Sequence, residues 1–187
     1  KLSGAGEGDI NEPIVETYKA RVRWLLVNLL TALLAASIIR AFEGTIEQMA
    51  VLAALMPMVA GVGGNAGTQT MAVAVRAIAT NQLTEANTLR TIVREIRVAL
   101  LNGVTVAIVI GVGVTLVLGS SQLGAVIAFA MLANIMIAGM AGVLVPVLLD
   151  RMDVDPAVSS SIFVTMITDS MGFLAFLGLA TAAGLAG

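Results

Sequence analysis

Five long apolar stretches, separated by short polar segments, constrain the fold of this chain more than any other feature of its sequence. A helix needs about 20 apolar residues to cross roughly 30 Å of hydrocarbon, and only helices and closed barrels satisfy their backbone hydrogen bonds there. The stretches are much longer than the roughly 10-residue strands of membrane barrels. They lie at about 24–39, 49–79, 98–118, 123–149 and 156–185. We therefore predict an all-α integral membrane domain with five transmembrane helices per subunit.

The composition excludes most soluble functions. Hydrophobic residues make up 58% of the 187 residues and charged residues 12%, whereas a soluble domain is about 25% charged. Cysteine and histidine are absent, which removes disulfides, thiol chemistry and the commonest metal ligand and general base. No nucleophile–base pair and no basic patch of nucleic-acid type is evident, so we expect neither an enzyme nor a nucleic-acid partner.

The basic residues predict the orientation of the spans. Five spans place the two ends of the chain on opposite sides of the membrane. With the N-terminus inside, every Lys and Arg except Arg40 is cytoplasmic, as the positive-inside rule requires. We predict an N-in, C-out, multi-pass protein of the cell (inner) membrane, surrounded by the lipid bilayer. The charged stretch 84–97 has helical spacing and is expected to form an amphipathic helix that leads into the third span.

The first residues read as a polar, glycine-rich segment without an initiator Met or a signal-peptide pattern. We expect 1–12 to be a linker, truncated from an upstream cytoplasmic regulatory region. Residues 13–187 are then expected to form the five-helix transmembrane channel domain.

One acidic residue stands in the middle of an apolar span, while every other acid falls in a terminus, a loop or an interfacial segment. Asp169 is 13 residues past Pro156, about 20 Å along a helix. A lone charge at that depth costs at least about 2.5–3.5 kcal/mol. No base lies near the middle of any predicted span to neutralise it, since Arg76 is at the cytoplasmic end of the second span. A helical wheel places it on a polar stripe with Ser161, Thr165, Thr168 and Gly172. Single hydroxyls usually bond between helices, but this stripe predicts that water, a proton or a cation accompanies the carboxylate.

The second span carries the other polar cluster, with four glycines within 61–67. The wheel puts Gly61, Asn65, Thr68, Gln69 and Ala72 on one face, and Gly63 with Gly67 on the other as a pair suited to close packing. Pro57 and the glycines are expected to break the helix and to expose carbonyls, including those of Gly61 and Gly64, as cation ligands. Asn65 is predicted to lie as deep as Asp169, although the sequence does not show that the two clusters face one another.

Carboxylate, amide, hydroxyl and carbonyl groups are hard oxygen ligands that suit Mg²⁺, Ca²⁺ or Mn²⁺. Our candidate metal ligands are Asp169, Asn65, Thr165, Gly61 and Gly64. One carboxylate per chain supplies too few charged ligands for a divalent ion. A two-fold homodimer around a central pore would bring two copies of Asp169 together, and a cation between them would relieve their repulsion. Because Mg²⁺ keeps several waters, such a site suits the hydrated ion.

Three functions remain open from the residues alone. The first is a passive Mg²⁺ channel. The second is a coupled carrier that exchanges Mg²⁺ with Na⁺ or H⁺, since a buried Asp can bind either ion. The third is a membrane anchor in which Asp169 only joins helices. The acidic loop formed by Asp150, Asp153 and Asp155 is either a solvated loop or a weak Mg²⁺-sensing site.

Residues 57–70, with the sequence PMVAGVGGNAGTQT, resemble the second-helix signature of the MgtE family of Mg²⁺ channels. The segments 42–46, 154–157 and 168–173 also fit that family, in the same order along the chain. The resemblance therefore covers nearly the whole sequence and the expected five spans.

The resemblance implies a homodimer with its pore at the subunit interface, where the aspartate that matches Asp169 holds hydrated Mg²⁺. It also implies cytoplasmic N and CBS domains, absent from this sequence, that bind Mg²⁺ and close the pore through a plug helix. Residues 13–19 match the end of that helix. Relatives carry Asn at the position of Ser161, so no role is transferred there. Mn²⁺ and Co²⁺ remain open as alternative cargo.

Overall fold

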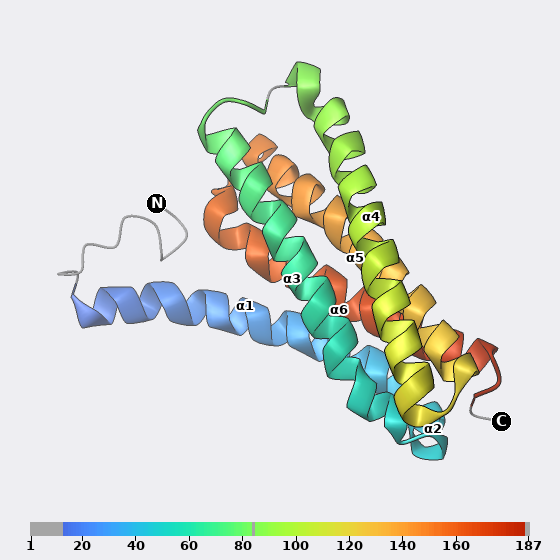
Figure 1. Ribbon diagram of the computed structural model, residues 1–187. Helices are drawn as coiled ribbons and strands as arrows, with labels where there is room; N and C mark the ends of the chain where they lie inside the picture. The colour runs from blue at the N-terminus through green and yellow to red at the C-terminus, as the bar shows by residue number, and fades with distance from the viewer. Residues whose placement is uncertain (1–12, 84, 186–187) are drawn as a thin grey trace.

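The computed structural model describes residues 13–83 and 85–185, and it is helical through nearly all of them (Figure 1). The expected linker 1–12 lies outside the described residues. The helices are α1 (Ile14–Ala41), α2 (Glu43–Gln48), α3 (Val51–Ala79), α4 (Glu85–Leu118), α5 (Ser121–Arg151) and α6 (Pro156–Ala182). All except the short α2 are long and apolar enough to cross a membrane, so the prediction of five candidate spans is confirmed.

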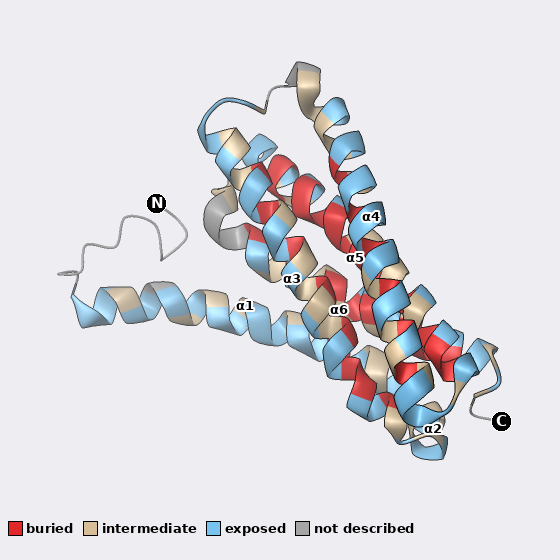
Figure 2. Cartoon of the chain, in the orientation of Figure 1, coloured by how far each residue is buried: buried red, intermediate tan, exposed pale blue. Residues whose placement is uncertain are grey.

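Helix α5 is the centre of the molecule. It packs against α3, α4 and α6, and half of its most apolar 18-residue window is buried (Figure 2). Its buried side includes Asn134, Ala138, Ala141 and Gly142, the small and polar residues expected to give this helix a tightly packed face. Because α5 packs against α3 and α6, each of these two helices has one inner and one outer face.

Helix α1 departs from the bundle (Figure 1). Among the α1 side chains that the structure describes, only Ala35 is buried. Its main partner is α6, reached near the C-terminal end of α1, where Ile39 and Phe42 pack on the core. The many exposed apolar side chains along this 28-residue helix suit a hydrocarbon surrounding.

Polar bonds join the elements at the end of the bundle where α2 lies. The hydroxyls of Thr45 and Thr181 are 3.0 Å apart, which ties α2 to α6. Gln122, at the start of α5, donates from Nε2 to the carbonyl of Ala183 across 2.6 Å. The α4–α5 connection and the end of α6 therefore share this end with α2, as Figure 1 also shows.

The second span is a continuous helix, so the predicted break is wrong. Helix α3 runs through Pro57 and all four glycines, and the residues before it form the separate α2. Within hydrocarbon no water replaces a lost backbone hydrogen bond, so a helix persists wherever its backbone can bond internally. Pro57 removes one donor, the one that would bond the carbonyl four residues earlier.

The boundaries of the last three helices largely follow the sequence signals. Helix α4 continues without interruption from Glu85 to Leu118, so the amphipathic segment and the third span are one helix, as expected. Gly119 has a φ of 69°, and the Oγ of Ser120 then accepts a hydrogen bond from the backbone N–H of Leu123 at 3.2 Å, capping α5. Helix α6 begins at Pro156, as predicted.

Candidate ion-conducting face

Helices α3 and α6 pack closely through small residues at the level of both polar clusters. A Cβ added to Gly64 would lie 4.0 Å from Oγ1 of Thr168, and one added to Gly67 would lie 2.6 Å from Cγ1 of Val164. Because higher numbers on α3 meet lower numbers on α6, the two helices run antiparallel. Asn65 follows Gly64 directly and Asp169 follows Thr168, so the two candidate ligands lie at the same level, as their predicted depths required.

Part of α3 at this level is left uncovered and polar. Gly61, Asn65 and Thr68, which we call the α3 polar face, are all exposed and follow one another at helical spacing. A Cβ added to Gly61 would meet nothing within 4 Å. On the opposite side of the helix Gly63 and Gly67 are buried, so the predicted division of the glycines between an open and a packed side is confirmed.

The predicted stripe of α6 is divided between a packed and an open part. Thr168 and Gly172 are buried, Gly172 against Asn134 of α5. Thr165 is exposed, and its carbonyl accepts a hydrogen bond from Oγ1 of Thr168 at 3.1 Å. Asp169 is half-buried at the margin between the two parts.

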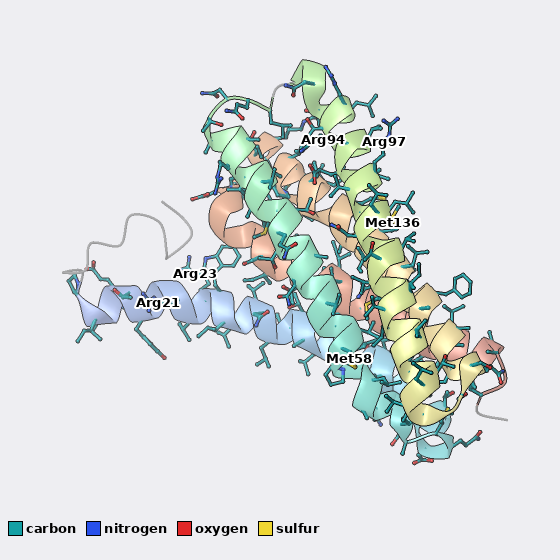
Figure 3. All side chains as sticks on the ribbon, in the orientation of Figure 1. Arg21, Arg23, Met58, Arg94, Arg97 and Met136 are labelled. Carbon is teal, nitrogen blue, oxygen red and sulfur yellow. The ribbon has the colours of Figure 1, made fainter. Side chains whose placement is uncertain are left out.

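The carboxylate of Asp169 has no protein counter-charge. Arg94 and Glu95 form the one ion pair found within the described ranges, and no hydrogen bond joins Asp169 to another described side chain. The labelled arginines of Figure 3 lie on α1 and on the part of α4 nearest the α3–α4 connection, away from the middle of α6. A half-buried carboxylate inside an apolar helix without a base nearby needs water, a proton or a cation.

The two glycine carbonyls proposed as ligands differ in availability. The Gly64 carbonyl accepts the helical N–H bond and also a hydrogen bond from Oγ1 of Thr68 at 2.8 Å, so both of its lone pairs are engaged. The Gly61 carbonyl also keeps its helical bond, but no described side chain is found to donate to it, and a Cβ at this position would meet nothing within 4 Å. Of the two glycines, Gly61 is therefore the better placed to bind an ion or its water.

A single chain supplies few charged ligands here. Over residues 13–83 and 85–185 there is no group of three or more acidic side chains that could hold a metal ion. Of the residues expected to form an acidic loop, Asp150 lies in the last turn of α5, and Asp153 and Asp155 lie in the α5–α6 connection, at the far end of α6 from Ala182. Asp169 is thus the one carboxylate that a single chain brings to the α3–α6 contact.

Two polar residues have surroundings in the structure that the sequence did not indicate. Gln69, expected on the same face of α3 as Asn65, is exposed and also lines a pocket between α3, α4 and α5. Glu95, expected in an interfacial segment, lines the same pocket and is 7% exposed. The sequence signal was present, because Glu95 lies within the apolar periodicity of α4, but its burial depends on how α5 packs.

A protein-family model for MgtE, described as a divalent cation transporter, matches residues 56–179, which contain the α3–α6 contact. The chain is also similar to three proteins named magnesium transporter MgtE. The one from Bacillus subtilis (strain 168) is 34% identical over 162 residues, 87% of this chain and 36% of the relative. Those from Enterococcus faecalis and Thermus thermophilus are 33% and 34% identical, and cover 96% and 89% of this chain.

The chain spans 36–40% of the length of these relatives. The matched segment nevertheless includes the α3 polar face, the packed glycines and Asp169. The family model covers well over half of the chain, and the relatives extend the similarity to most of the remainder. This chain belongs to the MgtE family of divalent cation transporters.

Proposed function

We propose that this chain forms the passive pathway by which Mg²⁺ crosses the cell membrane, in a pore between two copies of the chain. The family supplies the class of cargo, and the names of three relatives supply the ion. The observation that carries the proposal is the unpaired carboxylate of Asp169, in mid-span, level with the exposed α3 polar face.

The free-energy cost of exposing this polar surface to lipid favours a second copy of the chain that covers it. In lipid, Asn65, Thr165 and Asp169 would meet hydrocarbon, and the charge alone would cost at least about 2.5–3.5 kcal/mol. A two-fold axis beside the α3–α6 contact would turn this surface toward its symmetry mate and enclose water between them. The exposed sides of α1 add apolar area that lipid or the second copy would cover.

The ligand chemistry suits a hydrated divalent ion. Two copies of Asp169 repel one another unless a cation lies between them. Mg²⁺ sheds its waters reluctantly, and those waters are hydrogen-bond donors. The side-chain oxygens of Asn65 and Thr165 and the carbonyl of Gly61 are acceptors that can bind them. The carboxylates would supply charge, and the neutral groups would position the ion.

The same proposal covers orientation and partners. The distribution of Lys and Arg favours an N-in, C-out arrangement in the inner membrane. The relatives are much longer than this chain. Cytoplasmic N and CBS domains, implied by the resemblance, would lie in that additional length and would regulate the pore.

The test is Mg²⁺ flux into proteoliposomes at a set membrane potential, with no other ion gradient. We expect voltage-driven flux in the unmodified chain and a loss of at least about tenfold in Asp169→Asn, which removes the pore charge. Asp153→Asn is the matched control. It makes the same change at an exposed loop acid whose φ of 56° asparagine tolerates equally well.

Two results would overturn the proposal. Flux that is unchanged in Asp169→Asn would remove this residue from the pathway. Flux that appears only with an imposed Na⁺ or proton gradient would replace the passive pore with the coupled carrier.

A further inference from the structure

A polar pocket lies on the other side of α3 from its polar face. It has a volume of about 150 Å³, lies between α3, α4 and α5, and opens to the surface beside the exposed residues Gln69 and Asn102. Four of its lining residues carry polar side chains: Gln69, Thr70, Glu95 and Asn102. The remainder are small or aliphatic. A cavity of this size with several polar partners has room for a few waters or a partly hydrated ion.

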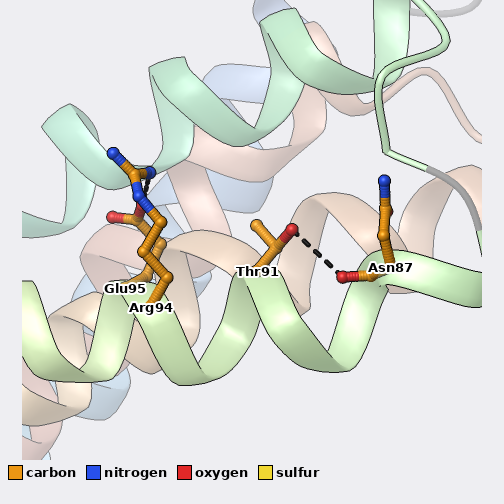
Figure 4. A network of polar contacts seen from close by, with 4 residues as sticks. All are labelled: Asn87, Thr91, Arg94 and Glu95. Carbon is orange, nitrogen blue, oxygen red and sulfur yellow. Dashed lines mark hydrogen bonds and ion pairs between the residues drawn. The ribbon is translucent and has the colours of Figure 1, made fainter.

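Glu95 gives the pocket a buried negative charge. It is the one charged residue that is buried among those the structure describes, at 7% exposed. Its Oε1 accepts a hydrogen bond from Nη1 of Arg94 at 2.7 Å, as Figure 4 shows. The Arg94 side chain is 69% exposed, so water screens its charge. Oε2 of Glu95 accepts no hydrogen bond from a described residue.

The neutral groups of the pocket are also unengaged. The side chains of Gln69, Thr70 and Asn102 form no hydrogen bonds within the described part of the chain. Each offers an oxygen that can turn toward the pocket, and they come from two different helices. Four oxygen-bearing side chains around one small cavity, one of them a buried carboxylate, form a set of hard ligands.

We propose that this pocket binds a small monovalent cation, tested here as Na⁺, through Glu95, Gln69, Thr70 and Asn102. The charge count selects a monovalent ion. One carboxylate carries one negative charge, and the exposed, water-screened guanidinium of Arg94 offsets only part of it. A divalent ion would therefore leave excess positive charge in the pocket. The three neutral side chains then complete the coordination of an ion that keeps part of its water.

Binding at this site would stabilise the contact of α3 with α4 and α5. Gly139 of α5 fixes how closely α4 can approach, since a Cβ there would lie 2.5 Å from that of Ala99. Gln69 directly follows Thr68 of the α3 polar face, so occupancy would act on the helix that also carries the proposed pore residues. The site itself does not depend on Asp169, and the two proposals fail separately.

The experiment measures the thermal unfolding midpoint of the purified chain in detergent, with EDTA present. NaCl is compared with N-methyl-D-glucamine chloride at equal ionic strength. We expect Na⁺ to raise the midpoint in a saturable manner, because a ligand that binds only the folded state stabilises it. Glu95→Gln should abolish the Na⁺ dependence. Asn102→Ala, at an exposed position that tolerates truncation, should weaken the apparent Na⁺ affinity about tenfold.

Two further variants separate the ion site from a simple ion pair. Arg94→Gln removes the competing guanidinium, so the Na⁺ effect should persist and become half-maximal at a lower concentration. Asp169→Asn should keep the full Na⁺ effect, whatever happens to its Mg²⁺ flux.

The proposal is overturned by equal midpoints in the two salts, or by a Na⁺ effect that survives in both Glu95→Gln and Asn102→Ala. A loss of the Na⁺ effect in Arg94→Gln would also overturn it, since Glu95 would then act only as the partner of Arg94. Stabilisation by MgCl₂ without EDTA that NaCl does not reproduce, and that Glu95→Gln abolishes, would show a divalent site instead.

Discussion

Asn134 of α5 donates a hydrogen bond from Nδ2 to the backbone carbonyl of Val59 in α3, across 2.9 Å in the interior of the bundle. The asparagine is fully buried, and Gly63 and Gly172 leave the space that its amide fills. Its Oδ1 has no hydrogen-bond partner among the described residues. One amide thus joins α3, α5 and α6 near the level of the α3 polar face, which makes it a positioning residue for that face.

We expect Asn134→Leu to lower stability modestly. Leucine has a similar size but cannot donate to Val59, whose carbonyl keeps its helical bond, so the loss should be about 0.6–1.7 kcal/mol. The measurement is the thermal unfolding midpoint in detergent. Asn28→Leu, at an exposed position on α1, is the matched control and should leave the midpoint unchanged. Equal midpoints for the two variants would show that the interhelical bond contributes nothing.

We expect Gly142→Ala to be more disruptive. The added Cβ would lie 2.8 Å from the backbone oxygen of Gly67 and 3.0 Å from the backbone nitrogen of Met71, and backbone atoms cannot move aside as a side chain can. Overpacking of this kind costs about 1–3 kcal/mol. Gly61→Ala adds the same methyl group in open space and should not lower the midpoint. A midpoint for Gly142→Ala at or above that of Gly61→Ala would contradict the packing.

Much of the fold was predictable because hydrocarbon imposes simple rules. The lengths of the apolar stretches predicted the five spans. The spacing of the small residues Gly63 and Gly67 predicted which side of α3 packs against its neighbours. The continuity of α3 was not predicted, because Pro57 and glycine are helix breakers in water but less so where the backbone has no other partner. The local sequence does not state whether water or hydrocarbon surrounds a segment, although this surrounding affects whether proline and glycine end a helix.

The candidate site was predictable to the level of its helices. Asp169 and Asn65 were found from polarity and depth alone, and the structure adds that Gly64 and Thr168 bring their helices together. Gln69 is exposed, as a residue of the polar arc should be, but it lies at the edge of that arc and also lines the pocket between α3, α4 and α5, which the sequence did not indicate. Glu95 was missed because its burial depends on α5, a separate helix whose residues Ile135 and Gly139 line the same pocket.

We expect Ser120→Ala to destabilise the start of α5. The Oγ of Ser120 caps the helix by accepting from the N–H of Leu123, and loss of such a cap costs about 0.5–2 kcal/mol. Hydrogen exchange of the first turn of α5 should accelerate. Ser121→Ala, the exposed first residue of the same helix, removes an identical hydroxyl without removing the cap. Equal exchange in the two variants would show that the cap is not formed in the membrane domain.

A substitution at Gly61 should separate an effect on Mg²⁺ transport from an effect on the stability of the fold. Gly61→Leu adds a bulky side chain where a Cβ meets nothing within 4 Å, so the unfolding midpoint should be unchanged. If the α3 polar face lines the pathway, the same side chain narrows it and excludes water. We then expect Mg²⁺ flux in proteoliposomes to fall at least about tenfold.

The control for this prediction is Val109→Leu on α4, a position 68% exposed on the apolar outer surface. It enlarges an exposed side chain by one methylene, away from the proposed pathway, and flux should stay at the level of the unmodified chain. Undiminished flux in Gly61→Leu, with the protein folded, would place the pathway elsewhere than the α3 polar face. Reduced flux in both variants would show that the loss comes from changed contacts between the helices and the bilayer, and not from a narrowed pore.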